Sequence, residues 1–333
     1  MSISTPYLLF LGDASDSLAA KTADGIARWR PENCVGQLRL PGCKADLGLA
    51  DTTVAAAAAA GAKTLVVGVA NRGGLISDSW QATLLQALDC GLDLAAGLHN
   101  RLADVPALAR RARERGRRLF DVRQPDRDFA VATGLPRSGR RCLAVGTDCS
   151  VGKMFTALAL EREARRRGIA ADFRATGQTG ILIAGAGVSV DAVVADFIAG
   201  ATEWLSPANA PDHWDFIEGQ GSLFHPSYAG VSLGLLHGAQ AEALVMCTEP
   251  GRPHMRGLPA RPLPDLAECI ALNEQCARLT CPSARVIGIA ANTAAMDGGE
   301  ARRWLAKTAD AFGMPAVDPV RTGVAALIDS LPA

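Results

Sequence analysis

Short apolar runs alternate with helical patterns along the first 125 residues. Four runs without regular polar alternation predict buried strands: Tyr7–Leu11, Thr64–Ala70, Leu92–Gly97 and Arg118–Val122. Four stretches of helical periodicity predict helices: Ser17–Trp29, Asp51–Ala60, Asp78–Cys90 and Val105–Arg115. Apolar strands separated by helices are typical of a parallel sheet covered on both faces. The pattern therefore predicts a Rossmann-like domain over residues 1–125.

The segment Arg123–Arg141 is rich in Pro, Gly and charge, lacks periodicity and predicts the link between two domains. The alternation then restarts. Strands are predicted at Arg141–Val145, Ala171–Ala175, His213–Ile217, Ala243–Cys247 and Val286–Ala290, with one more near the C-terminus. Helices are predicted at Lys153–Arg166, Asp191–Gly200, Ser232–His237, Asp265–Leu279 and Gly299–Phe312, with a last one ending at Asp329. We expect a second α/β domain over residues 126–333.

A glycine-bounded loop, Gly146–Lys153, joins the first strand of this second domain to its first helix. Glycines let the backbone fold so that its amides point inward, the helix end adds partial positive charge, and Lys153 adds a full charge. An ordinary strand–helix turn with an exposed lysine is the competing interpretation, but every part of the phosphate-binding pattern occurs in the right order. The residues expected to bind the phosphates are Gly146, Thr147, Cys149, Ser150, Val151, Gly152, Lys153 and Met154. This predicts a P-loop NTPase-like α/β fold for the second domain.

The loop departs from the standard phosphate-binding motif in two ways. Five residues, rather than four, separate Gly146 from Gly152, and this spacing resembles the loop of dethiobiotin synthetase and related P-loop enzymes. Met154 stands where a Ser or Thr would hold magnesium. Thr156, one turn later, has poorer geometry for that task. We therefore expect a loop that grips phosphates without cleaving them, and no metal cofactor.

Two loops of the first domain are candidate ligand sites. The turn after Tyr7–Leu11 contains a single glycine, Gly12, where a dinucleotide site needs three, so a plain sheet turn is the favoured interpretation. The loop Asn71–Gly74 follows the strand Thr64–Ala70 at the sheet edge where ligands bind, but an ordinary loop is equally consistent with it.

Composition narrows the class of protein. Hydrophobic residues make up 49% and charged residues 20%, and the 34 basic side chains balance 34 acidic ones. Nucleic-acid binders usually carry a basic excess, and the basic run Arg110–Arg118 is interpreted as a solvated helix face. The nine cysteines include no CxxC pair, and no apolar run reaches membrane-span length. We expect a cytoplasmic homo-oligomer that acts on a small molecule and binds neither nucleic acid nor membrane.

Several motifs occur in one order along the chain. They are Gly146–Lys153, Arg174–Ile181, Asp191–Asp196, Asp215–Ser222, His225–Pro226, Pro250–Arg252 and Asp318–Arg321. Over essentially its full length, the chain resembles the bacterial family that includes the DgcN-type D-glutamate N-acetyltransferases. The resemblance implies transfer of an acetyl group from acetyl-CoA to the amine of a D-amino acid, with D-glutamate as the type substrate. Acetyl-CoA is thus the expected co-substrate, with its phosphates held by the P-loop.

Such a transfer needs a base for the ammonium group and cations for the acceptor carboxylates. Glu218 is the first candidate base because it follows an apolar strand; a metal- or water-binding role and a capping role remain open. Histidine is a common general base in enzymes, so His225 is the second candidate, but it could equally form a structural turn. Asp148 could orient Lys153 or the acceptor amine. A covalent route through Cys149 is open as well, although most cysteines of this kind are packing residues.

Four residues are expected to bind the acceptor: Arg174, Gln178, Gln220 and Arg252. Arg174 could hold a carboxylate with two parallel hydrogen bonds, although a plain surface arginine is the alternative. The first hypothesis is therefore an N-acetyltransferase. The second is an ATP-dependent ligase or kinase of the dethiobiotin synthetase type, and the third is a nucleotide-sensing protein without catalysis.

Overall fold

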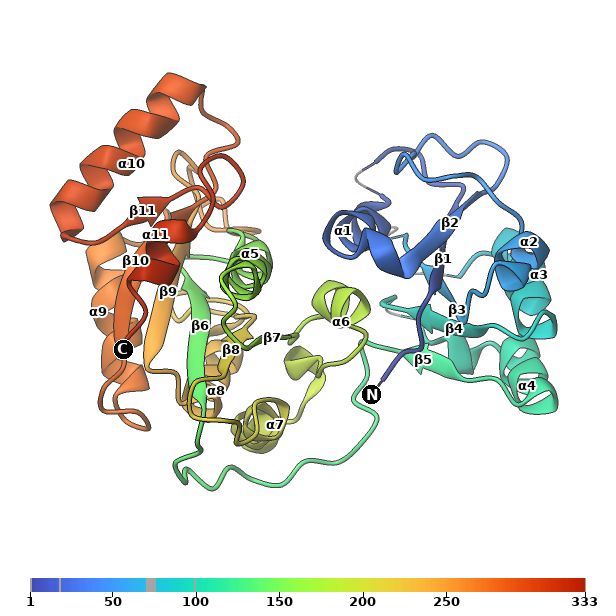
Figure 1. The fold of residues 1–333 in the computed structure, drawn as a ribbon, viewed down its shortest axis with the longest axis horizontal. Coiled ribbons are helices and arrows are strands. Elements are labelled where there is room, and N and C mark those ends of the chain that lie inside the picture. The colour runs from blue at the N-terminus through green and yellow to red at the C-terminus, as the bar shows by residue number, and fades with distance from the viewer. Residues whose placement is uncertain (1, 18, 70–75, 99, 333) are drawn as a thin grey trace. The chain divides into compact units, whose positions relative to one another are not determined.

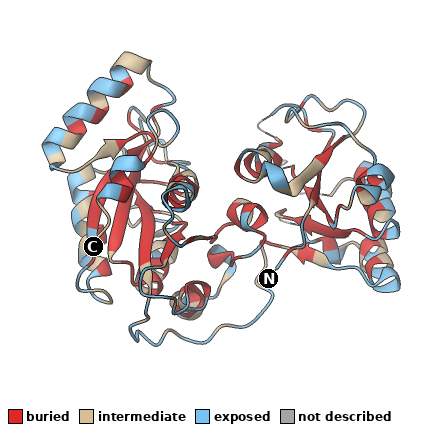
Figure 2. Cartoon of the chain, viewed as in Figure 1, coloured by how far each residue is buried: buried red, intermediate tan, exposed pale blue. Residues whose placement is uncertain are grey.

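The computed structural model describes residues 2–17, 19–69, 76–98 and 100–332. The predicted loop Asn71–Gly74 lies outside these ranges. The chain forms two compact units, which we describe separately (Figures 1 and 2). The first unit comprises Met1–Asp126 with Gly177–Ala192, and the second comprises Arg127–Thr176 with Val193–Ala333. No helix in the described ranges combines the length and the apolar character that a membrane span requires.

The first unit contains a five-stranded parallel sheet of order β2-β1-β3-β4-β5. Its strands are β1 (Tyr7–Gly12), β2 (Cys34–Arg39), β3 (Thr64–Val67), β4 (Asp93–Ala96) and β5 (Leu119–Asp121). Its helices are α1 (Lys21–Trp29), α2 (Val54–Ala59), α3 (Asp78–Asp89), α4 (Pro106–Arg115) and α6 (Gln178–Ala184). The predicted Rossmann-like parallel sheet is thus confirmed. Strand β2 was not predicted, because Gly36 and the buried Gln37 interrupt its apolar run.

Trp80 of α3 fills the space next to the turn that ends β1. A Cβ atom added at Gly12 would lie 2.9 Å from the Trp80 ring, so only glycine fits there. The indole Nε1 donates a hydrogen bond to Asp13 across 2.9 Å, and the ring packs edge-on against Phe10. An indole therefore stands at the place where a dinucleotide-binding turn would need room for a pyrophosphate.

Residues 177–192 pack with the first unit, although the predicted domain boundary placed them in the second. Within this segment the sequence analysis predicts no helix before Asp191, but Gln178–Ala184 forms helix α6, in which Ile181, Leu182 and Ile183 are buried. A Cβ atom added at Gly25 of α1 would lie 3.4 Å from both Thr179 and Ile183. The predicted helix Asp191–Gly200 is wrong: two short 3₁₀ turns, Val190–Ala192 and Ala195–Phe197, precede helix α7 (Ile198–Leu205).

The second unit contains a six-stranded parallel sheet of order β11-β10-β9-β6-β8-β7. Its strands are β6 (Arg140–Gly146), β7 (Ala171–Arg174), β8 (Trp214–Ile217), β9 (Ala243–Thr248), β10 (Arg285–Ala291) and β11 (Ala316–Val317). Besides α7, its helices are α5 (Lys153–Arg166), α8 (Ala229–Ala239), α9 (Leu266–Ala277), α10 (Gly298–Phe312) and α11 (Ala325–Asp329). Figure 2 shows the strands buried and the helices exposed on their outer faces. Because all strands run parallel, the loops after β6, β8, β10 and β11 meet at one sheet edge.

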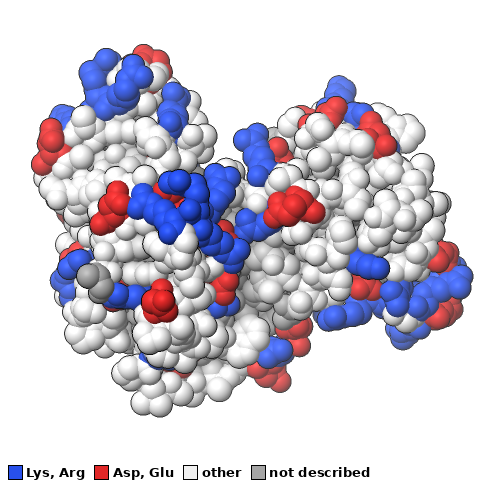
Figure 3. Space-filling view, viewed as in Figure 1, with Lys and Arg blue, Asp and Glu red and all other residues white. Residues whose placement is uncertain are grey.

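On the face drawn in Figure 3, basic and acidic side chains are both present and in several places lie next to one another. In the basic run of α4, Arg111 and Arg115 both pair with Asp89. At the end of α5, Arg166 and Arg167 both pair with Glu163. The ion pairs of Arg111 and Arg115 with Asp89 agree with the interpretation of the Arg110–Arg118 run as a solvated helix face.

Candidate phosphate-binding site

The loop between β6 and α5 has the shape that its glycines require. A Cβ atom at Gly146 would lie 2.8 Å from the Val151 side chain and 3.1 Å from the Cys247 carbonyl oxygen. Gly152 adopts φ +105° just before the helix begins, and Ser150 is left-handed at φ +55°. The predicted strand–loop–helix context of a phosphate-binding loop is therefore present.

Lys153, the first residue of α5, is buried inside this loop with 6% of its surface exposed. Its Nζ donates a hydrogen bond to the Asp148 carbonyl oxygen across 2.8 Å. Burial lowers the pKa of the Lys153 ammonium, because the charged form loses hydration. The carboxylates of Asp148 and Glu218 partly offset this shift, and an anion in the loop would add further negative charge beside the ammonium group.

A cavity of about 540 Å³ opens beside the loop. It is lined by four segments: 149–156 of the loop and α5, 218–221 after β8, 290–292 at the end of β10, and 318–320 after β11. Cavities of this size accept nucleotide-sized ligands. Of the sequence-predicted site residues, eight line it: Cys149, Ser150, Val151, Gly152, Lys153, Met154, Glu218 and Gln220.

The structure places no hydroxyl where a P-loop magnesium ligand would be. Met154 lines the cavity, but its side chain offers only a thioether. The Thr156 hydroxyl donates to the Gly152 carbonyl oxygen across 3.0 Å and accepts from the Cys247 thiol. The side chain that could have replaced the missing hydroxyl is therefore already bound within the protein.

Glu218 lies directly after β8 and has 5% of its surface exposed. One carboxylate oxygen accepts a hydrogen bond from the Thr176 amide at 3.0 Å, and the other accepts from Gln220 Nε2 at 3.2 Å. The Thr176 hydroxyl also donates to the Glu218 carbonyl oxygen. Glu218 and Gln220, both predicted as site residues, thus lie together at the cavity wall, and both are hydrogen-bonded to Thr176, which was not predicted.

Asp148 and Arg252 lie behind the loop and do not line the cavity. The Asp148 side chain is fully buried; one of its oxygens accepts from the Cys149 amide, and the other from Arg252 Nη1 and the Arg256 amide. Arg252 also reaches the carbonyl oxygens of Cys149 and Ser150. Its guanidinium is therefore committed to the loop rather than turned toward a bound ligand.

His225 occupies a buried turn. The Ser227 amide donates to its Nδ1 at 3.2 Å, so Nε2 carries the proton and donates to the Arg256 carbonyl oxygen at 3.2 Å. The ring stacks on Tyr228, with centroids 4.6 Å apart. Both ring nitrogens are engaged, which agrees with the structural-turn alternative for His225.

Asp148, Cys149 and His225 offer potential metal-ligand atoms that lie within 4.8 Å of one another. The Arg252 guanidinium already neutralises Asp148, and both nitrogens of His225 have hydrogen-bond partners. A cation would have to displace these contacts, so the residues present do not fit a metal site.

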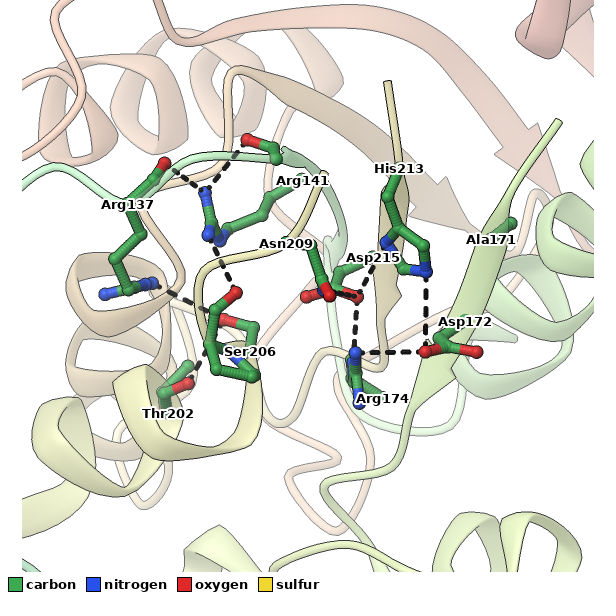
Figure 4. A network of polar contacts seen from close by, with 12 residues as sticks. Arg137, Arg141, Ala171, Asp172, Arg174, Thr202, Ser206, Asn209, His213 and Asp215 are labelled. Carbon is green, nitrogen blue, oxygen red and sulfur yellow. Dashed lines mark hydrogen bonds and ion pairs between the residues drawn. The ribbon is translucent and has the colours of Figure 1, made fainter. Parts of the chain in front are cut away.

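Arg174, at the end of β7, is not among the residues that line the cavity, and Figure 4 shows it beside Asp172 and Asp215. Its Nε donates to Asp215 at 2.8 Å and its Nη2 to Asp172 at 3.1 Å, and His213 lies 3.4 Å from Asp172. Burial raises the pKa of Asp215, although the Arg174 guanidinium opposes this shift. Arg174 is thus held in an ion-pair network, and this placement does not favour the predicted carboxylate-binding role.

Gln178 is the first residue of α6 and belongs to the first unit, where its side chain accepts a long hydrogen bond of 3.4 Å from Arg123. The acceptor-binding role of Gln178 stays a prediction.

The segment 318–320 was not predicted as a cavity wall. Asp318 is buried and accepts hydrogen bonds from the Thr293 amide and hydroxyl and from the Val320 and Arg321 amides. Burial raises the pKa of Asp318, but these hydrogen bonds outweigh it and leave that pKa below the usual value. The carboxylate therefore shapes the loop, and its position just after a strand is the signal that could have indicated a site.

Comparison with known proteins covers both units. Residues 38–125 match the Rossmann-like domain and residues 130–328 the P-loop domain of a family described as a domain of unknown function, DUF1611. A crystal structure of a DUF1611 family protein from Anabaena variabilis is 35% identical, with a TM-score of 0.80 over 98% of both chains.

Two curated relatives carry a functional name. A D-glutamate N-acetyltransferase from Tritonibacter scottomollicae is 56% identical over 331 residues, which is 99% of each chain. One from a Pseudoalteromonas species is 46% identical over 331 residues, covering 99% of this chain and 100% of the relative. The chain therefore belongs to the DUF1611 family and, like these relatives, is an acyltransferase.

Proposed function

We propose that the protein transfers the acetyl group of acetyl-CoA to the amine of D-glutamate. The choice of D-glutamate as the acceptor rests on the match to two D-glutamate N-acetyltransferases along almost the whole chain. The loop Gly146–Lys153 supports acetyl-CoA as the acetyl donor, because coenzyme A contains a pyrophosphate and a ribose phosphate that the loop could bind. The second unit thus binds coenzyme A through phosphates that are remote from the reacting thioester bond.

The cavity has a suitable layout for the nucleotide end of coenzyme A. Neighbouring strands of a sheet lie about 4.8 Å apart. In the order β11-β10-β9-β6, Asn292 is two strands and Pro319 three strands from the phosphate loop, or about 10 and 14 Å. With phosphates at the loop, the nucleoside would extend toward Asn292, Pro319 and Val320.

We expect the loop to bind the phosphates of coenzyme A without cleaving them. Met154 offers no oxygen, and the Thr156 hydroxyl is bound to Gly152, so the loop lacks the side chain that holds magnesium in P-loop ATPases. Lys153 and the loop amides would carry the counter-charge. These residues favour a carrier-binding loop over the ATP-dependent ligase or kinase alternative.

Amide formation would begin with loss of a proton from the D-glutamate ammonium group, with Glu218 as the proposed base. The free amine attacks the thioester carbonyl; the new C–N bond forms, the C–S bond breaks, and the departing thiolate of coenzyme A takes up a proton. The pantetheine arm has about twelve bonds between its terminal oxygen and its sulfur, which is the length of about four residues, or about 14 Å when extended. Glu218 is near enough to Lys153 to act on its charge, and a Cβ atom at Gly219 would lie 3.1 Å from the Lys153 side chain. This role of Glu218 therefore requires an arm that folds back across the cavity.

The test uses purified protein with acetyl-CoA and a panel of D- and L-amino acids, following release of free thiol. A parallel reaction supplies Mg–ATP with the same acceptors and follows ADP. Thiol release restricted to D-glutamate and its near analogues would support the proposal. ADP formation without thiol release would overturn it in favour of the ligase.

A further inference from the structure

The phosphate-binding loop is held from behind by one ion pair. Asp148 lies within the loop and is fully buried, and its Oδ2 is 2.8 Å from Arg252 Nη1. The Arg256 amide donates to the same oxygen at 2.7 Å. Both donors belong to the segment that follows β9, so the carboxylate ties two neighbouring loops of the sheet together.

Arg252 makes further contacts to the backbone of the same loop. Nη1 donates to the Cys149 carbonyl oxygen at 2.8 Å and Nη2 to the Ser150 carbonyl oxygen at 3.0 Å. Glu249 pairs with Nη2 and holds the guanidinium in place. One side chain thus anchors two consecutive carbonyl groups.

The anchoring of these carbonyls decides where the loop amides point. In a trans peptide the C=O and the following N–H point in opposite directions. With the Cys149 and Ser150 carbonyls directed at Arg252, the amides of Ser150 and Val151 point to the other side of the loop. Both residues line the cavity, and within the described chain neither amide has a hydrogen-bond partner. Arg252 therefore presents two amides ready to bind an anion.

We propose that Arg252 and Asp148 form a clamp that sets the phosphate-binding conformation of the loop. Arg252 is then a positioning residue for the carrier and not a ligand of the acceptor carboxylates. The left-handed backbone of Ser150, at φ +55°, is a conformation that non-glycine residues adopt rarely and that needs such external support. This inference rests on the proposed function, in which the loop holds the phosphates of coenzyme A.

The test compares Arg252→Ala, Arg252→Lys and Asp148→Asn in the full chain. Coenzyme A binding is measured by calorimetry, and KM is measured separately for acetyl-CoA and for D-glutamate. We expect Arg252→Ala to weaken coenzyme A binding and raise KM for acetyl-CoA by about tenfold or more, with KM for D-glutamate nearly unchanged. Arg252→Lys keeps the positive charge but cannot bond to two carbonyl groups and a carboxylate at once, so its effect on coenzyme A binding should be intermediate. Asp148→Asn should also weaken coenzyme A binding.

Arg261→Ala is the matched control, because Arg261 is an exposed arginine of the same segment; its coenzyme A affinity should remain that of the unaltered protein. A rise in KM for D-glutamate with unchanged coenzyme A binding in Arg252→Ala would overturn the clamp and make Arg252 an acceptor ligand. Unchanged values for both substrates would also overturn it. If the unaltered protein does not bind coenzyme A, the proposed function fails instead, so the two failures are distinguishable. Thermal unfolding of each variant identifies any that do not fold, in which case Arg252→Lys decides.

Discussion

The ammonium group of Lys153 donates a hydrogen bond to the carbonyl oxygen of Asp148, five residues earlier in the same loop, across 2.8 Å. This bond spans the loop and keeps a buried positive charge at its centre. A phosphate entering the loop would exchange a neutral acceptor for a charged one, and charge-assisted hydrogen bonds are the stronger kind. The internal contact therefore keeps the lysine in place without competing strongly with the ligand.

Replacing Lys153 with alanine should weaken coenzyme A binding by about 10- to 100-fold, the usual effect of losing a hydrogen bond to a charged group. Isothermal titration calorimetry with coenzyme A measures this directly. Lys307→Ala, at an exposed position of α10, is the control and should bind like the unaltered protein. Equal affinities for the two variants would place the phosphates outside this loop.

Replacing Glu218 with glutamine should lower kcat by about 100-fold or more, as expected for loss of a general base, while coenzyme A affinity changes little. Glutamine keeps an oxygen that can accept from the Thr176 amide, so the loop after β8 should keep its shape. The measurement is kcat and KM for acetyl-CoA with D-glutamate, together with a direct binding constant. A variant that turns over normally would show that another group takes the proton.

The phosphate loop was predictable from the sequence because its pattern is local. An apolar strand, two glycines, a lysine and a helix stand next to one another, and the structure places them as expected. The cavity wall opposite the loop was not predictable in the same way. Asn292 and Asp318 reach it only because β10 and β11 lie in the order β11-β10-β9-β6, and chain order does not determine strand order.

Side-chain partners were harder to predict than elements. Arg174 is the last residue of a strand, where ligand-binding residues are common, yet it bonds to Asp172, two residues earlier, and to Asp215 on the neighbouring strand. Arg252 stands in a Pro- and Gly-rich loop and holds backbone carbonyls rather than a substrate. Such contacts depend on register and loop conformation, which a single sequence does not reveal.

Chelation of metal should leave acetyl transfer unchanged. Met154 and Thr156 provide no free hydroxyl at the loop, so the phosphates are expected to bind through Lys153 and the backbone amides. The experiment compares the initial rate after extensive dialysis against EDTA with the rate in added magnesium. A rate that falls by tenfold or more in EDTA and returns with magnesium would contradict the proposal that the loop binds the phosphates without a metal ion.

Trp80 should make a large contribution to the stability of the first unit. It is 2% exposed, packs against Phe10 and donates to Asp13. Trp80→Ala should lower the free energy of unfolding by about 3–5 kcal/mol, the usual cost of such a cavity. Urea denaturation measures the change. Trp204→Ala, at a residue that is 42% exposed, should cost about 1 kcal/mol, and similar losses for both would contradict the packing role assigned to Trp80.

Alkylation of Cys149 should report on the occupancy of the loop. Burial raises the pKa of its thiol and outweighs the nearby cations Lys153, Arg256 and Arg252. Only the thiolate reacts, so iodoacetamide should modify Cys149 slowly at pH 7 and faster as the pH rises toward and above the usual thiol pKa of about 8.5. Coenzyme A should suppress the modification, because the residue lines the cavity. Peptide mass mapping follows the site, with Cys149→Ser as the control. Fast alkylation at pH 7 would contradict the raised pKa of the thiol. Alkylation that coenzyme A leaves unaffected would contradict the assignment of the loop as the binding site for coenzyme A.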